Sequence, residues 1–166
     1  MKKFICLLMA VLLCVTGCDF SREETPGVLF YYLRESEDFV YGSADGVVTG
    51  EERDPSGYKN NLNYLITLYL QGPVDENLQS PFPAGCKLVV LSQEDEELTL
   101  LLNSNFCTLK DMDLTLACVC LAKTCFSLTD AKQVRIMAES FSGQVAIDQT
   151  IHINSLLLED TPQSTE

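Results

Sequence analysis

His152, the cysteines and one acidic run are the side chains of this sequence that could perform catalysis or bind a metal ion. His152 is the single histidine, and no nearby motif supplies the nucleophile and orienting residue of a triad. Cys118 and Cys120 lack the C-x-x-C spacing of zinc and redox sites, and residues two apart on a helix point in different directions. The acidic run 94–97 lacks the glycine and alternating ligands of a calcium loop. We therefore expect no catalytic residue, no metal site and no cofactor.

Cys18 ends a segment with the features of an export signal. Two lysines give a positive start, an apolar run covers 4–13, and small residues come before the cysteine. The apolar run is shorter than the ~20 residues that a transmembrane helix needs. The residues Val15-Thr16-Gly17-Cys18 resemble the lipobox of bacterial lipoproteins, whose cysteine is acylated and becomes the first mature residue. We therefore predict a signal peptide at 1–17, lipidation of Cys18, and anchoring to the outer face of the bacterial cytoplasmic membrane.

Five further cysteines follow Cys18, and an odd number outside the cytoplasm cannot all form disulfides. They are Cys86, Cys107, Cys118, Cys120 and Cys125. We expect free thiols in a reduced sample, with Cys86 and Cys107 as the expected pair on oxidation. Cys118 and Cys125 should react slowly, because they share the apolar stripe of a helix. An alternative interpretation is an extracytoplasmic enzyme that uses one thiol for redox or hydrolytic chemistry, which a low-pKa thiol beside His152 would support.

The charge of the chain narrows the kinds of partner it can have. Acidic residues outnumber basic ones by 24 to 11, which gives a net charge of −13. Loss of the two lysines of the signal would make the mature chain about −15. Such a surface lacks the basic patch that nucleic acids and anionic headgroups require. We therefore expect no nucleic acid as a ligand and a basic protein or counter-ions as the partners, with an oligomer left open.

Residues 27–158 are expected to form one domain, after a tether at 18–26 and before a disordered tail at 159–166. The hydrophobic periodicity predicts strands at 28–33, 87–93, 98–103 and 131–137, helices at 61–70 and 111–126, a loop or irregular hairpin at 38–54 and an apolar segment at 145–158. The helix 111–126 is apolar nearly all round. The order β-α-β-β-α-β predicts an α+β fold, with a small, mainly antiparallel sheet and both helices packed on one face.

The hairpin formed by the second and third predicted strands provides a candidate interaction surface. If the acidic run is its turn, Val89 and Leu91 point to the core with their partners on the opposite strand. Leu88, Val90 and Leu101 then share the other face. That face is more apolar than a solvated sheet surface usually is, so we predict that either the early loop or a partner covers it.

Four short segments follow one another in the order found in a known domain. They are Leu65 to Pro73 with its Leu-Gln-Gly-Pro end, Pro83 to Leu88 with its Pro-Ala-Gly start, Leu100 to Phe106, and the closing strand Leu128 to Met137. Together they resemble the GerMN domain of lipoproteins that act in sporulation and spore germination, over about 28–138. Cys86 departs from the family pattern, which has a hydroxyl residue there.

The resemblance implies a non-enzymatic role. GerMN domains resemble the ring-building folds that assemble envelope complexes, and they occur on lipoproteins that face a membrane. This chain has a single copy of the domain, where the founding member of the family has two. The expected function is a lipid-anchored interaction and assembly module of the cell envelope, in sporulation or germination.

Overall fold

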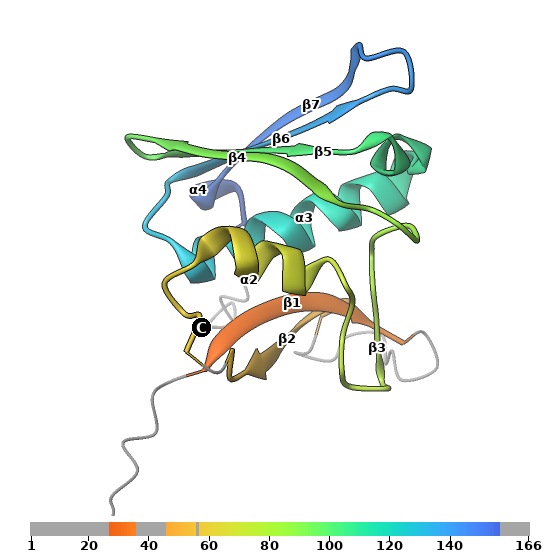
Figure 1. The fold of residues 1–166 in the computed structure, drawn as a ribbon. Coiled ribbons are helices and arrows are strands. Elements are labelled where there is room, and N and C mark those ends of the chain that lie inside the picture. Colours follow the sequence, from red (N-terminus) through yellow and green to blue (C-terminus); the bar gives the residue numbers. More distant parts are fainter. Residues whose placement is uncertain (1–26, 36–45, 56, 157–166) are drawn as a thin grey trace, which may run out of the picture.

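The computed structural model describes residues 27–35, 46–55 and 57–156 (Figure 1). The predicted signal peptide 1–17, the lipidation site Cys18, the tether 18–26 and the tail 159–166 lie outside these residues, as do the last two residues of the predicted domain. Across the described ranges, no helix has both the length and the apolar character needed to cross a bilayer.

The strands form two separate sheets (Figure 1). The smaller sheet has the order β2-β1-β3, with β1 at Val28–Arg34, β2 at Val48–Arg53 and β3 at Leu78–Gln79. The larger has the order β4-β5-β6-β7, with β4 at Leu88–Glu94, β5 at Glu97–Leu102, β6 at Gln133–Glu139 and β7 at Val145–His152. All pairs are antiparallel except β5 with β6, which run parallel because α3 connects them.

The helices fill the layer between the two sheets (Figure 1). They are α2 at Leu62–Tyr69, α3 at Asp111–Leu128 and the short α4 at Ile153–Leu156, with a 3₁₀ helix at Ser104–Thr108. Asn61 caps α2 by accepting a hydrogen bond from the Tyr64 N–H at 3.0 Å. The predicted α+β class is confirmed, and α2 and α3 lie on the same face of the larger sheet.

The prediction of one sheet is wrong, because β1 belongs to the smaller sheet. The apolar surface of α3 gives the reason. Ala117, Leu121 and Ala122 are fully buried in a cluster that contains side chains of both sheets. A helix that is apolar nearly all round must be covered on two sides. β1 supplies the second cover with Phe30 and Tyr32, both 0% exposed.

One edge of β1 pairs with β3 only at its end. Side chains of the helices hydrogen-bond to the backbone groups that this leaves unpaired. The Tyr31 backbone N–H donates to Thr124 Oγ1 at 2.8 Å, and the Tyr31 carbonyl accepts from the Tyr69 hydroxyl at 2.7 Å. Ser127 Oγ donates to the Leu29 carbonyl at 2.7 Å. Buried backbone groups need such partners, so these bonds fix the smaller sheet against the helices.

The segment 48–53, predicted as part of a loop or irregular hairpin, forms β2. Its inward side chains include Glu51 and Arg53, which form an ion pair and are 10% and 11% exposed. Arg53 Nη2 donates to the Gly72 carbonyl at 2.7 Å, and Glu51 Oε1 accepts from the backbone N–H groups of Val74 and Asp75. This network holds the turn after α2. Charged inward residues hide the apolar alternation by which a strand is recognised in a sequence.

Candidate interaction surface

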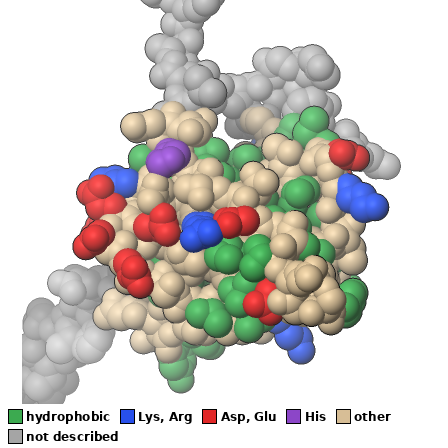
Figure 2. Space-filling view, turned by 90° about the horizontal axis from the view of Figure 1, so that it is seen from above, with side chains coloured by type: hydrophobic (Ala, Val, Ile, Leu, Met, Phe, Trp, Pro, Cys, Tyr) green, Lys and Arg blue, Asp and Glu red, His purple; other side chains and the backbone are tan. Residues whose placement is uncertain are grey.

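The outer face of the larger sheet points away from the helices and carries the candidate partner residues (Figure 2). The strand register aligns Val90, Leu101 and Met137 across β4, β5 and β6. Val90 is 49% exposed, and Leu101 and Met137 are half-buried. We call these three residues the apolar row. Figure 2 shows hydrophobic side chains gathered in the middle of this face and acidic ones toward one end.

Leu88 does not belong to this surface, contrary to the prediction. The predicted pair of Leu91 with Leu100 is present, but a bulge at Val89 shifts the register, so that Leu88 pairs with Leu102. Leu102 is fully buried, and Leu88 packs against the same core. A one-residue shift turns a side chain to the other face of a sheet. Val90 and Leu101 remain on the outer face, and Val89 at the bulge is 57% exposed.

The acidic run forms the turn between β4 and β5, as predicted. Glu94 and Glu97 lie directly opposite each other, and Asp95 adopts a positive φ of 51° in the turn. We call Glu94, Asp95, Glu96 and Glu97 the acidic tip. Gln133 Nε2 donates to Glu97 Oε2 at 2.5 Å. Like charges directly opposite each other on two strands are destabilising, so this arrangement costs the isolated hairpin stability.

Arg135 lies between the apolar row and the acidic tip on the same face. Its guanidinium donates two hydrogen bonds to the carboxylate of Asp148 on β7, at 2.8 and 2.6 Å. These bonds hold the pKa of Asp148 below its usual value and raise that of Arg135. Arg135 therefore pairs mainly with Asp148, and its positive charge also interacts with Glu97 of the acidic tip.

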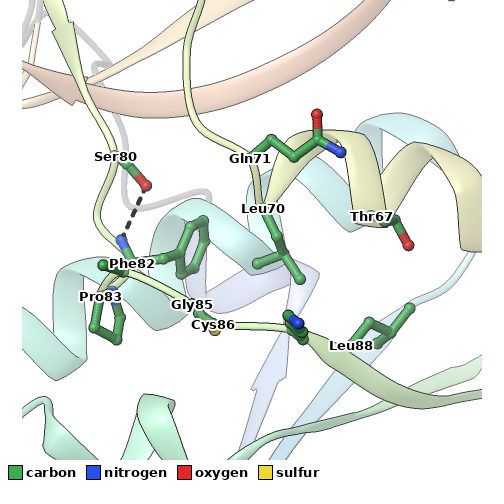
Figure 3. Close-up of a pocket in the computed structure, with 11 residues that line it drawn as sticks. Thr67, Leu70, Gln71, Ser80, Phe82, Pro83, Gly85, Cys86 and Leu88 are labelled. Atoms are coloured by element: carbon green, nitrogen blue, oxygen red, sulfur yellow. Dashed lines mark hydrogen bonds between the residues drawn. The ribbon is translucent and has the colours of Figure 1, made fainter.

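A groove of about 620 Å³ lies between α2 and the segment that leads into β4 (Figure 3). Leu70, Phe82 and Leu88 are part of its apolar lining. The segment is held from the end of β5: the Asn103 amide donates to the Gly85 carbonyl at 2.9 Å and accepts from the Lys87 N–H at 3.0 Å. Sequence reasoning did not identify Asn103 as a clamp, because its partners are 16 and 18 residues away.

Cys86 also lines this groove and is 7% exposed. Burial raises the pKa of its thiol to about 12, so the thiol is protonated at neutral pH and a poor nucleophile. Cys86 belongs to the core, whereas Cys107 lies on the 3₁₀ helix and is only partly buried. The expected pairing of Cys86 with Cys107 on oxidation assumed a regular hairpin, with both side chains on its outer face. That placement is wrong, because the bulge changes the register of β4 and Cys86 lies in the core.

The remaining chemical candidates do not converge on a site. All five cysteines of the domain are free, and burial raises the pKa of each thiol, for example to about 11 at Cys118. His152 is exposed at the end of β7 opposite Gln133, whereas Cys86 precedes the other end of the larger sheet. Within the described ranges, no group of three or more His, Cys, Asp or Glu side chains could hold a metal ion. The low-pKa thiol required by the enzymatic alternative is not found.

Met137 is a member of the surface that sequence reasoning missed. The alternation of Val134 and Ile136 with their neighbours already indicates that Met137 points outward. The alternation does not show which strand lies beside β6. The parallel pairing of β5 with β6 sets Met137 next to Leu101 and so completes the apolar row.

The two-layered arrangement of sheets around α2 and α3 defines a GerMN-like domain. The fold is similar to the tandem GerMN domains of the sporulation protein GerM from Bacillus subtilis, with a TM-score of 0.51 and 21% identity. The match covers 76% of this chain and 44% of that one, so this chain spans less than half of the tandem protein. No protein-family model matches the sequence, and no curated protein matches it. The likeness of fold agrees with the four sequence segments described above.

Proposed function

We propose that this protein is a lipid-anchored, extracytoplasmic interaction module that assembles into a complex of the cell envelope, in sporulation or germination, without catalysing a reaction. Its docking surface is the outer face of the larger sheet. The observation that carries the proposal is the apolar row, in which three large side chains stand together on a face that no element of the described chain covers. The likeness of the fold to the domains of a sporulation protein supports the biological setting.

The position of the tether suits this proposal. The predicted anchor at Cys18 is joined to β1 by residues 18–26, which can span about 30 Å when extended. β1 lies in the smaller sheet, on the other side of the helices from the docking surface (Figure 1). The docking surface therefore faces away from the point where the tether joins the domain.

Crosslinking in the native membrane tests the docking surface. A photoreactive amino acid replaces Met137 on the surface or, as a control, Glu76 in the exposed loop before β3. We expect a crosslinked species of defined mass from position 137 and none from position 76. Equal crosslinking at both positions, or none at position 137, would contradict the proposal.

Mass spectrometry of the membrane fraction tests the anchor. We expect an N-terminal peptide that begins at an acylated Cys18. A mature chain that begins at another residue and carries no lipid would show that the anchor is wrong. A Cys18→Ala variant is expected to leave the membrane fraction, because a single export signal without acylation provides no stable attachment.

A further inference from the structure

We propose that the outer face of the larger sheet binds a basic amphipathic protein segment, whose apolar side chains cover the apolar row and whose lysines or arginines meet the acidic tip. This inference rests on the proposed function and adds the chemistry of the partner. The surface that carries it consists of two regions on one sheet face, one apolar and one acidic, with Ser92, Thr99 and Arg135 between them.

The acidic tip lacks the positive charges that would neutralise it. Four carboxylates stand in four consecutive residues, and two of them oppose each other across the hairpin. Lys132, whose backbone N–H donates to the Glu96 carbonyl at 2.7 Å, brings one positive charge next to these four. Arg135 pairs mainly with Asp148. A cationic partner would further relieve the repulsion between Glu94 and Glu97.

The charge of the chain argues against a second copy as the occupant of this face. Two copies would each carry a net charge of −13 or, after loss of the signal, about −15, so their approach is opposed by electrostatic repulsion. An anionic membrane surface is opposed in the same way. A basic protein segment is attracted at long range and can then bury the apolar row.

The spacing of the two regions specifies the pattern of the partner. Outward residues alternate along a strand, so the acidic pair Glu94 and Glu97 lies four residues from Val90 and Leu101. At about 3.3 Å per residue, this separates the acidic and apolar rows by about 13 Å. An α-helix covers the same distance in about nine residues. Residues nine apart point to opposite sides of a helix, because each residue turns it by about 100°. A helix along β4 and β5 therefore needs its apolar and basic side chains about seven or eight residues apart, where they share one side and are ~10–12 Å apart along the axis.

Binding of designed peptides to the full chain, purified in a non-ionic detergent, tests this inference. The probe is a labelled helical peptide with two leucines at one end and two lysines about seven or eight residues away on the same side. A second peptide has glutamates in place of the lysines. We expect the basic peptide to bind, as measured by fluorescence anisotropy, and its affinity to fall with added salt. The acidic peptide should not bind.

Three variants separate site-specific binding from general attraction to an acidic protein. Glu94→Gln combined with Glu97→Gln should weaken binding roughly tenfold, and Val90→Ser should weaken it by a similar factor. The control combines Glu76→Gln with Asp113→Asn, which removes two negative charges from exposed positions elsewhere. We expect the control to change the affinity less than about twofold, because a distant exposed charge contributes little.

Each other outcome overturns the inference. Absence of binding, or equal weakening by the control, would show that the face has no specific preference for a basic segment. Self-association of the full chain that is abolished by Val90→Ser would identify a second copy as the occupant. If position 137 crosslinks in the native membrane while the basic peptide does not bind, the docking surface stands and the proposed chemistry of the partner is wrong.

Discussion

Replacement of Thr124 by valine is expected to weaken the attachment of the smaller sheet to α3. Thr124 is 0% exposed, and its Oγ1 accepts the hydrogen bond from the Tyr31 backbone N–H at 2.8 Å. Its side chain also forms a hydrogen bond with the phenol of Tyr69. Valine preserves the β-branched shape of threonine but can neither accept nor donate these bonds. The substitution therefore removes polar contacts with little change in volume.

The expected loss of stability follows from the Tyr31 N–H. A buried donor that loses its acceptor costs about 1–3 kcal/mol, because the group stays removed from water. The additional apolar contact of the valine methyl group offsets part of this cost. We expect the free energy of unfolding to fall by about 2 kcal/mol, a substantial part of the 5–15 kcal/mol typical of a domain.

Urea unfolding followed by circular dichroism measures this difference. The slope of the free energy against urea concentration should stay unchanged, because the variant exposes the same surface on unfolding. The matched control is Thr115→Val in the same helix, where the exposed hydroxyl bonds to the Asp111 carbonyl at 3.0 Å. We expect the control to change stability by less than about 0.5 kcal/mol. A Thr124→Val variant as stable as the control would refute the role of this bond, as would unchanged hydrogen exchange at the Tyr31 amide.

Three further predictions concern the charged network of β2 and the thiols. Arg53→Met should reduce the free energy of unfolding by about 3 kcal/mol, since it leaves Glu51 buried without its partner, and adding Glu51→Gln should restore part of the loss in urea unfolding. Alkylation at pH 8 with peptide mapping should modify Cys107 first and Cys120 slowly, because burial raises the pKa of Cys120 to about 12, and equal rates would contradict the packing. Because the folded thiols have raised pKa values, stability should fall as the pH rises above about 8.5, where only the unfolded thiols ionise.

The elements that sequence reasoning located well are those whose signals are local. The helix predicted at 61–70 forms α2 with Asn61 as its cap, and the chain leaves it through Gly72 at a φ of 101°. The acidic run forms the hairpin turn. In each case neighbouring residues decide the outcome, through capping bonds, helical spacing or the geometry of a turn.

The prediction of one sheet did not use a signal that the sequence contains. The helix predicted at 111–126 has apolar residues nearly all round, which one sheet face cannot cover. The missing partner was β1, whose own pairing strand β2 has inward charges at Glu51 and Arg53. The fold tolerates these two buried charges because they form an ion pair and hydrogen-bond to the turn after α2. These bonds join residues that are far apart in the sequence.

The sequence by itself determined the acidity of the domain, its helices, its hairpin turn and the outward direction of Val90 and Leu101. Only the tertiary structure decided the makeup of the candidate surface. The bulge at Val89 turns Leu88 toward the core, while parallel pairing brings Met137 beside Leu101. Both outcomes depend on contacts between segments that are distant in the chain. A shift of one residue in the pairing of two strands moves every side chain of a strand to the other face of the sheet, and the local sequence does not specify that pairing.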